Sequence, residues 1–495
     1  MRIIGNNPQL SRQTQGTASG AITGGKPVLV NTDGTVSMIS NAATAVAASV
    51  GSVLAIRSSA ETASQDIVYD TGRDKFITAL ARGDTTASHM NVLTVSGTSV
   101  SKGSDVAYNN TKGYRSRLAF DTNSNIGVVA YQDLGNSHYG TAIAFSGTGT
   151  GIGSLSSEVV FESATARVYG AIYDSNADRV VIFYRDDGNS NAGTAVVGTL
   201  SSGPSVSFGT PVSIGSAIDE LNHTAEITFD SNSNKVVLIY RDTGNSNYGT
   251  AIVGTVDSSD NSISFGNETV FNVGAVLSMR ATFDSNSNKV VIAYQDVGNS
   301  GHGTAIVGTV SGTSISFGSE VVFNAAEVEN GLGIDFDTTR NKVIIAYRNN
   351  GNSGKATAIE GTVSGTSISF ATPIVFDDNI CIDISVVFDP DTLKSVLFYN
   401  DSSNGMRAKV YSPPSTTTNL SASTSEAFIG FAEDTVATGQ PVTINTKGAI
   451  DENQSSLTPA QQYFVQTDGT LGTSADDPSV VAGTAVTATK LIVKG

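Results

Sequence analysis

Short apolar runs alternate with polar turns along most of this chain. Between Ala281 and Phe323, runs rich in Val, Ile, Phe and Tyr are separated by clusters of Ser, Asn and Gly. Runs of about five to eight residues with this composition are typical of β-strands. Nothing between them has the length and periodicity of an amphipathic helix. The stretch therefore predicts a four-stranded antiparallel meander.

The meander recurs along the chain, and an aromatic residue followed by Asp marks the end of the first strand of each copy. The seven marks, which define repeats 1 to 7, are Tyr69-Asp70, Phe120-Asp121, Tyr173-Asp174, Phe229-Asp230, Phe283-Asp284, Phe336-Asp337 and Phe388-Asp389. A four-stranded unit that recurs every roughly 50 residues is the signature of a β-propeller. We predict an all-β fold containing a seven-bladed β-propeller of four-stranded blades.

Repeat 7 lacks a fourth strand, because its third strand, Met406 to Ser412, is followed by two prolines. A matching segment lies near the other end of the chain, where Ser49 to Ile56 resembles Ser316 to Phe323, the fourth strand of repeat 5. We predict that this N-terminal strand closes the last blade, which would leave neither end of the ring with an unpaired edge.

The segments outside the repeats predict a smaller second module. Residues 20–40 have the pattern of a hairpin that turns at Asp33-Gly34. The run Pro441 to Ile450 resembles Pro27 to Val36, and closure of the ring brings both chain ends to one blade. The predicted parts are an N-terminal hairpin and attachment segment (1–45), the propeller (46–412), a linker rich in Ser, Thr and Pro (413–425), and a C-terminal β module (426–495) that pairs with the N-terminal segment.

The composition excludes several classes of partner. A formal net charge of −17 disfavours nucleic acid and anionic lipid. The single cysteine, Cys381, allows no intrachain disulfide. The first residues lack the apolar core of a secretory signal peptide, and no segment has the length and hydropathy to enter a membrane. The expectation is a protein made in the cytoplasm without a signal peptide.

The turn after each first strand offers one candidate for chemistry. In repeats 2, 4 and 5 it reads Asp-x-Asn-x-Asn, beginning at Asp121, Asp230 and Asp284, and repeat 3 has Asp178 in the last place. Alternating oxygen ligands resemble the first half of a calcium loop. The favoured interpretation is a polar turn in which Asp and Asn bond their own backbone, because no bidentate Glu follows at the required spacing. We therefore expect no metal and no cofactor.

Other features disfavour an enzyme. The second strands end in Tyr-Arg-Asp or Tyr-Gln-Asp, but identical residues in successive repeats are typical of scaffolding. The four histidines, His89, His138, His223 and His302, are dispersed among the repeats. The chain has no Trp to serve as a sugar platform. No repeat shows an out-of-pattern cluster of His, Glu or Asp, so we predict no catalytic residues.

Recognition is expected on one rim of the propeller. The loops after the second strands and the crossings between blades are longer and more varied than the other turns, and such loops commonly carry function. The candidate contact residues on this rim are His138, Tyr139, Tyr248, His302 and Lys355. The alternative is that these residues are solvated loop tips without a ligand.

The chain also resembles a known group of proteins. The resemblance rests on Ile3 to Pro8 (IIGNNP), Gln13 to Ile22 (QTQGTASGAI), the repeats themselves, and Ser456 to Gly495, which ends in KLIVKG. These stretches are similar to virion structural proteins of marine tailed bacteriophages, often labelled tail or fibre proteins. The resemblance implies location in the virion and other phage virion proteins as partners.

The function expected from this resemblance is that of a capsid decoration, spike or tail-fibre component that presents a β-propeller on the particle surface, where it adheres to a host glycan or protein. The apolar runs of the terminal module suggest that the module also associates with copies of itself, with a trimer as the predicted oligomer. The alternative function is a carbohydrate-binding or carbohydrate-cleaving propeller module, which a glycan array or a depolymerase assay on host envelope would distinguish.

Overall fold

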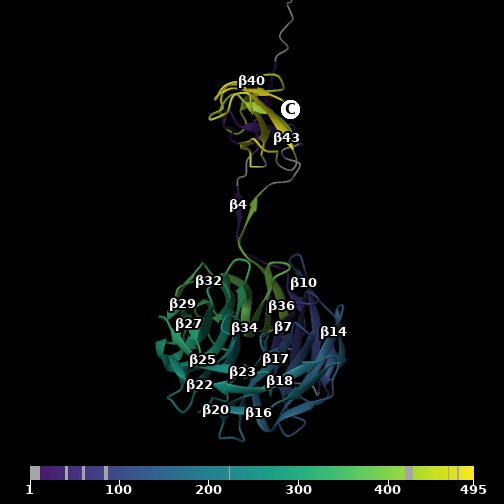
Figure 1. The fold of residues 1–495 in the computed structure, drawn as a ribbon, viewed down its shortest axis with the longest axis vertical. Coiled ribbons are helices and arrows are strands. Elements are labelled where there is room, and N and C mark those ends of the chain that lie inside the picture. Colours follow the sequence, from purple (N-terminus) through teal and green to yellow (C-terminus); the bar gives the residue numbers. More distant parts are fainter. Residues whose placement is uncertain are drawn as a thin grey trace, which may run out of the picture. The chain divides into compact units, whose positions relative to one another are not determined.

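The computed structural model describes residues 12–39, 43–57, 62–82, 87–221, 223–418, 427–466, 468–475 and 479–494. The chain forms two compact units, here called the terminal unit (Met1–Ala47 with Pro414–Gly495) and the repeat unit (Ala48–Pro413). In the described residues the regular structure is antiparallel β-strand apart from two short 3₁₀ turns, η1 (Val297–Asn299) and η2 (Asn350–Asn352). The fold is all-β and β-propeller-like, with sheets arranged around a common centre in the repeat unit (Figure 1).

Each repeat contributes three consecutive antiparallel strands, and the first of them ends at the aromatic-Asp mark. The strands are β7 (Thr62–Asp70), β8 (Lys75–Arg82) and β9 (Ser88–Ser96); β12 (Gly113–Asp121), β13 (Ile126–Asp133) and β14 (Tyr139–Thr148); β16 (Val159–Asp174), β17 (Arg179–Asp186) and β18 (Ala192–Ser201); β21 (Ala225–Asp230), β22 (Lys235–Asp242) and β23 (Tyr248–Asp257); β25 (Thr269–Asp284), β26 (Lys289–Asp296) and β27 (His302–Ser311); β30 (Leu332–Asp337), β31 (Lys342–Asn349) and β32 (Lys355–Ser364); and β34 (Ile374–Asp389), β35 (Lys394–Asp401) and β36 (Gly405–Ser412).

The fourth strand differs from the prediction, because it is broken into two pieces that pair with opposite halves of the third strand. In repeat 5, β28 (Ser314–Phe317) and β29 (Val321–Glu327) both pair with β27. Gly318 stands at the break, and a Cβ there would collide with the carbonyl oxygen of Thr366 in the next repeat. The close approach of that neighbouring turn leaves no room for a side chain at this position. The corresponding short strands are β10 (Ser99–Lys102), β11 (Val106–Asn109), β15 (Gly151–Leu155), β19 (Ser205–Phe208), β20 (Val212–Ala217), β24 (Ser262–Phe265) and β33 (Ser367–Phe370).

Three strands serve two repeats each. The 16-residue strands β16, β25 and β34 begin as the outer piece of one repeat and continue as the first strand of the next. The sequence pattern places a strand end between these two parts, whereas the backbone passes through without a turn. Neighbouring repeats are therefore joined by continuous β-structure at these three crossings.

The N-terminal segment pairs with repeat 7, as the sequence predicts. The strands β5 (Ser49–Val50) and β6 (Leu54–Ala55) run antiparallel to β36, with Val50 opposite Tyr411 and Leu54 opposite Ala408. The first strands of the repeats contact one another in chain order from β7 to β34, and β34 also contacts β7.

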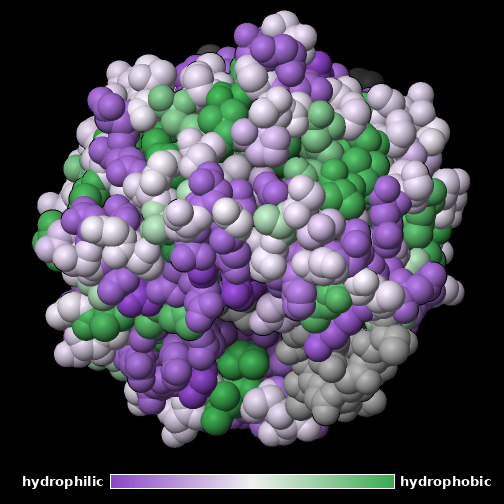
Figure 2. Space-filling view, turned by 90° about the horizontal axis from the view of Figure 1, so that it is seen from below, coloured by the Kyte–Doolittle hydropathy of each residue, from purple (hydrophilic) through white to green (hydrophobic). Residues whose placement is uncertain are grey.

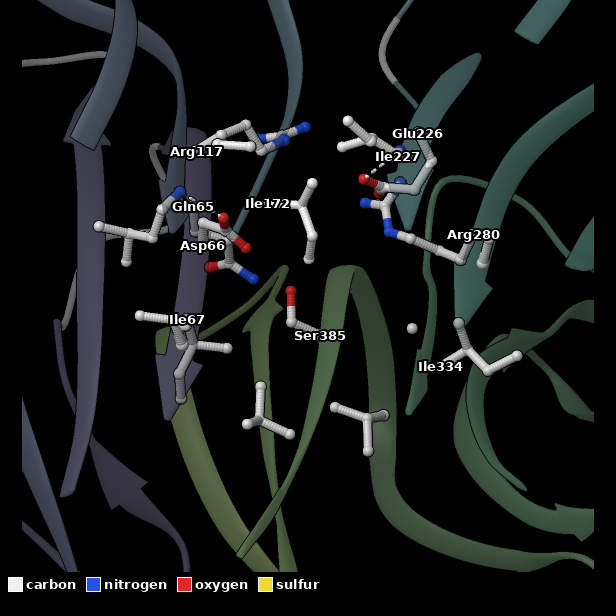
Figure 3. A pocket seen from close by; sticks show the side chains of 17 residues that line it. Gln65, Asp66, Ile67, Arg117, Ile172, Glu226, Ile227, Arg280, Ile334 and Ser385 are labelled. Carbon is white, nitrogen blue, oxygen red and sulfur yellow. Dashed lines mark hydrogen bonds and ion pairs between the residues drawn. The ribbon is translucent and has the colours of Figure 1, made fainter. Parts of the chain in front are cut away.

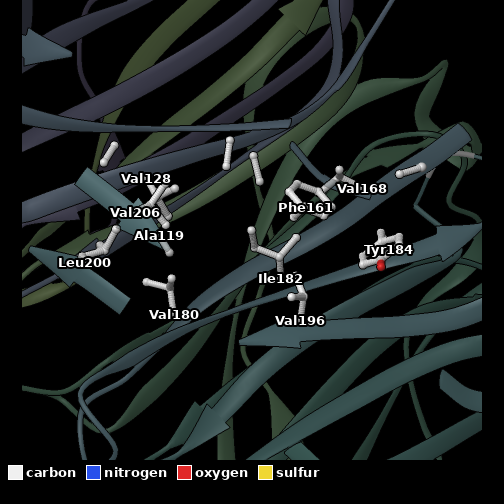
Figure 4. Packing of buried hydrophobic residues seen from close by; sticks show 14 of the residues in the cluster. Ala119, Val128, Phe161, Val168, Val180, Ile182, Tyr184, Val196, Leu200 and Val206 are labelled. Carbon is white, nitrogen blue, oxygen red and sulfur yellow. The ribbon is translucent and has the colours of Figure 1, made fainter. Parts of the chain in front are cut away.

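The hydrophobic core lies between neighbouring sheets. Figure 4 shows the cluster shared by repeats 2 and 3, in which Ala119 and Val128 pack with Val168, Ile182 and Val196. Second strands such as β26 are buried on both faces, which explains why their apolar runs are continuous and do not alternate with polar residues. Full burial of each Val or Ile contributes about 1.5–3 kcal/mol. At the surface, hydrophobic and hydrophilic residues are interspersed on the face shown in Figure 2.

The turn after each first strand is built by the Asp of the mark. Asp121 Oδ1 accepts the backbone N–H groups of Asn123 at 2.8 Å and Ser124 at 3.1 Å. Four residues after the marked Asp, the backbone is left-handed in all seven repeats, with φ between 54° and 59°. The residues at this position are Asp74, Asn125, Asp178, Asn234, Asn288, Asn341 and Leu393. Asp and Asn tolerate this conformation, but Leu does not.

Replacing Leu393 by Asn is expected to stabilise the repeat unit by about 1 kcal/mol, because a branched side chain in a left-handed conformation carries roughly that strain. Leu393 is 47% exposed, so little packing is lost with its side chain. Denaturant unfolding measures the change. The matched control is Asn341→Leu, which places Leu in the same turn of repeat 6 and should destabilise by a similar amount. Equal stabilities for Leu393→Asn and the unmodified protein would contradict the strain argument.

The terminal unit contains two five-stranded sheets. One combines both ends of the chain, in the order β1 (Gln13–Thr17), β39 (Pro441–Asn445), β38 (Phe428–Ala432), β2 (Pro27–Val30), β3 (Val36–Met38). The other has the order β40 (Ile450–Asp451), β44 (Leu491–Val493), β43 (Val480–Ala485), β41 (Gln462–Val465), β42 (Leu471–Gly472). The predicted hairpin is β2–β3, and Gly34 in its turn has φ 81°.

One expectation about the terminal segments needs correction. Part of the expected linker is a strand, β37 (Ser415–Thr418), which pairs with β4 (Ala43–Val46); three consecutive threonines have high β-propensity. Much of the apolar surface of the terminal runs is buried within the unit, where Phe431, Val465 and Leu491 have no exposed surface, and self-association of the unit stays a prediction. No helix in the described ranges is long and apolar enough to cross a membrane.

Candidate functional site

The five rim residues predicted from the sequence lie in separate places. Tyr139, Tyr248, His302 and Lys355 each begin the third strand of a different repeat, opposite the last residue of the second strand. His138 precedes Tyr139 and is exposed, with a left-handed backbone at φ 63°. Within the described residues, no hydrogen bond or ion pair joins any of the five side chains to another. Their role in recognition stays a prediction.

The tyrosines two residues before the ends of the second strands have a structural role. Tyr184 donates at 3.0 Å to Glu162 of β16, and Tyr240 donates at 2.7 Å to Glu268, just before β25; both rings are fully buried. The same bond joins Tyr294 to Glu320 at 2.9 Å. These bonds join the second strand of a repeat to the start of its outer strand piece. They agree with the interpretation of the repeated residues as scaffolding.

The out-of-pattern residues that the sequence reasoning missed meet at the centre of the repeat unit. A cavity of about 190 Å³, here called the central cavity, is lined by residues from β7, β12, β16, β21, β25, β30 and β34. Six of the residues that lie four positions before a marked Asp line it: Asp66, Arg117, Glu226, Arg280, Gly333 and Ser385. The cavity thus collects two carboxylates and two guanidinium groups, one from each of four repeats (Figure 3).

Repeats 1 and 2 supply one half of the cavity wall. Asp66 Oδ2 accepts the backbone N–H of Leu118 at 2.8 Å, which links β7 to β12. Arg117 donates through Nε to the carbonyl of Tyr169 at 2.7 Å and through Nη1 to that of Ser116 at 2.9 Å. Burial raises the pKa of Asp66, and the positive charge of Arg117 opposes that rise. Among the described residues, no ion pair joins these two opposite charges.

Repeats 4 and 5 supply the other half. Arg280 Nη1 lies 3.4 Å from Glu226 Oε2, and Glu226 Oε1 also accepts the N–H of Ile227 at 3.1 Å. Burial raises the pKa of Glu226 and lowers that of Arg280, and in each case the partner's charge opposes the shift. This half therefore contains an ion pair that is nearly removed from solvent, with side chains only 13% and 16% exposed.

A hydrogen-bonded bridge between distant repeats contacts the Glu226–Arg280 pair. His223, just before β21, lies with Nε2 2.8 Å from Asp383 Oδ1 of β34, and its Nδ1 accepts a hydrogen bond from Arg280. Both residues of the bridge are left-handed, His223 at φ 60° and Asp383 at φ 50°. Asp383 lies in an irregularity of the β34–β35 pairing, and such bulges re-aim side chains beside functional sites.

The bridge makes folding depend on pH. Burial and the charge of Arg280 lower the pKa of His223 to about 4, from 6.5. Neutral His223 therefore contributes stability above about pH 6.5 that is lost as the pH falls towards 4, to a total of roughly 3 kcal/mol. His223→Gln, which keeps a donor for Asp383 and an acceptor for Arg280, should remove this loss. Denaturant unfolding of both proteins across that range measures the difference, and parallel stability curves would contradict it.

The raised pKa values of three carboxyls on first strands act in the opposite direction. Burial raises the pKa of Asp66, Glu226 and Asp335, the last to about 6, so their protonation favours the folded state as the pH falls. The test of His223 therefore depends on the difference between the two proteins, because the carboxyl contributions are common to both.

Removal of divalent ions is expected to leave the melting temperature unchanged. The marked aspartates already accept backbone N–H bonds, as Asp230 does from Asn232 and Ser233, both at 2.9 Å. Across the described ranges, no group of three or more His, Cys, Asp or Glu side chains could hold a metal. Thermal unfolding with and without EDTA is the measurement. A large fall in EDTA that calcium restores would show a stabilising site in these turns.

A signal for the central cavity was present in the sequence. Aligning the repeats on the aromatic-Asp mark places Asp66, Arg117, Glu226 and Arg280 at one common position, where the other repeats have Gly or Ser. The aromatic-Asp mark repeats at the end of each first strand, whereas the residue four positions earlier varies from repeat to repeat. His223 and Asp383 had no such signal, because a left-handed residue and a bulge bring them together.

Comparisons with known proteins add little to this geometry. No protein-family model matches the sequence, and no curated protein matches it. Among solved structures, a crystal structure of a protein from Lactobacillus plantarum aligns over 65% of this chain and 86% of its own, with 11% sequence identity and a TM-score of 0.46. The class defined by the chain's own strand pairing is an all-β, β-propeller-like fold.

Proposed function

We propose that this chain is a bacteriophage virion structural protein, a capsid decoration, spike or tail-fibre component, that presents its repeat unit on the particle surface. The observation that carries the proposal is the joining of both chain ends in one small β unit, separate from the repeats. That construction leaves the repeat unit free of chain termini and suits it to display. The resemblance of the terminal stretches to phage tail and fibre proteins is the reason for proposing a phage particle as its location.

The repeat unit is, in this proposal, a closed propeller of seven four-stranded blades. Three observations support the count: seven aromatic-Asp marks, the contact of β34 with β7, and a central cavity lined from seven first strands. The pairing of β5 and β6 with β36 supports closure by the N-terminal strand. A closed ring has no blade free to pair with a neighbour.

Attachment then falls to the terminal unit, and recognition of a host glycan or protein falls to the rim that carries His138, Tyr139, Tyr248, His302 and Lys355. A trimer is the proposed oligomer, since closed cyclic symmetry is the usual arrangement of identical chains. Lys355 forms an exposed ion pair with Asp378 at 2.7 Å. Such a pair contributes little free energy, so a ligand could replace Asp378 as the partner of Lys355 at small cost.

The test uses purified phage particles and two antibody fragments, one against residues 48–413 and one against the terminal unit. The fragment against the repeat unit should label intact particles, while that against the terminal unit should label only disrupted ones. Light scattering of the full chain and of residues 48–413 should give a trimer and a monomer. Absence of the protein from purified particles would refute the proposal.

Carbohydrate binding or cleavage is the second candidate, favoured by the presence of two carboxylates, Asp66 and Glu226, in one cavity. The volume of about 190 Å³ is below the roughly 300 Å³ of the smallest usual ligand pockets, so an oligosaccharide does not fit there. A positive depolymerase assay on host envelope would favour this candidate.

A further inference from the structure

We propose that the central cavity binds one small zwitterion, a compound with a carboxylate and an ammonium group separated by one or two carbons. The inference is independent of where the protein sits on a particle. It rests on the size of the cavity, on two opposite charges that no ion pair joins, and on one buried acceptor without a donor.

The two charges are Asp66 and Arg117. They come from adjacent first strands and line the same cavity, and Arg117 is only 7% exposed. Buried opposite charges normally pair. Here Arg117 uses Nε and Nη1 on backbone carbonyls, and Asp66 accepts the backbone N–H groups of Leu118 and Ile67, so no ion pair joins the two charges in the described structure. A carboxylate on Arg117 and an ammonium on Asp66 would satisfy both groups.

Gln65 supplies the independent observation. Its side chain is 5% exposed and lines the cavity, its Nε2 donates to the carbonyl of Asp383, and its Oε1 has no hydrogen-bond donor. A buried acceptor without a donor costs about 1–3 kcal/mol. An ammonium group has three N–H donors, so it could serve both Oε1 of Gln65 and Oδ1 of Asp66.

The other half of the cavity limits the ligand. Glu226 and Arg280 already pair with each other, so they offer no uncompensated charge. Ile67, Ile172 and Ile334 also line the cavity and suit a short carbon skeleton (Figure 3). A dry cavity of about 150 Å³ holds benzene, so about 190 Å³ admits a molecule of roughly eight non-hydrogen atoms. Glycine, alanine and β-alanine fit this description.

The experiment is calorimetric titration of the full chain with glycine and β-alanine, and with acetate, methylammonium and glycerol as partial or neutral probes. We expect one zwitterion per chain, with acetate and methylammonium each at least about tenfold weaker, because each satisfies only one of the two charges. Asp66→Asn and Arg117→Gln should each weaken glycine binding by about tenfold or more. Lys355→Gln, on the rim, is the matched control and should bind as the unmodified protein does.

Folding of each variant is checked by thermal unfolding without ligand. If Arg117→Gln does not fold, Arg117→Lys replaces it, since Lys keeps the charge but loses the planar fork that bonds two carbonyls and a ligand together. The proposal is overturned if no zwitterion binds, if acetate or glycerol binds as tightly as glycine, or if the Asp66 and Arg117 variants bind glycine unchanged.

Discussion

A fragment of residues 57–413 is expected to aggregate, whereas residues 48–413 should be soluble and unfold cooperatively. The two fragments differ only by the segment that contains β5 and β6. Without these strands β36 has an unpaired edge, and Ile56, which is 4% exposed, leaves a gap in the core cluster shared with Phe76 and Phe398. Unpaired edges template association, and loss of one such core side chain alone costs about 2–5 kcal/mol.

Size-exclusion chromatography and thermal unfolding of the matched fragments measure the effect. Because neither fragment contains the terminal unit, its loss cannot account for a difference between them. Equal solubility and equal melting temperatures would show that the repeat unit does not need the N-terminal strand.

Arg280→Met is expected to cost about 3–5 kcal/mol of the free energy of unfolding, because it leaves the Glu226 carboxylate buried without its partner. It also removes the donor to His223 Nδ1. Adding Glu226→Gln to Arg280→Met should recover much of the loss, since the unpaired charge is then absent. The Glu226 carboxyl keeps a proton to higher pH in the single variant, so its loss of stability should shrink as the solution becomes acidic.

Urea unfolding of the single and double variants provides the measurement. Lys490→Met is the comparison on the surface, where Lys490 and Glu452 pair at 2.6 Å with 41% and 59% of their side chains exposed. That pair should be worth at most about 1 kcal/mol. Similar losses at both places, or no recovery in the double variant, would contradict a structural role for the buried pair.

The repeat architecture could be predicted because its signals are local. The Asp of each aromatic-Asp mark stabilises the turn that follows it, as Asp121 does by accepting the N–H groups of Asn123 and Ser124. The closing strand could also be predicted, since Ser49 to Ile56 has the sequence pattern of a fourth strand. The steric restriction at Gly318 could not, because the contact that leaves no room for a side chain comes from Thr366 in the following repeat.

The central cavity could not be placed from one repeat alone. Asp66 and Arg117 look like single charges in two apolar strands until the strands stand side by side. The bridge from His223 to Asp383 spans 160 positions of sequence and depends on two left-handed residues, neither of which is Gly or Asn. Such contacts follow from the closure of the whole unit and have no local pattern.

The chain passes between its two units twice, at Ala47–Ala48 and at Pro413–Pro414. A single proteolytic cut in either passage therefore leaves the units covalently joined through the other. Tension on the terminal unit reaches repeat 7 through β5 and β36 together, since Ser49 is paired with Ser412 beside both passages. Because β5 and β36 are antiparallel neighbours, their ends nearest the terminal unit lie side by side. The force therefore pulls both strands in the same direction and does not slide one along the other.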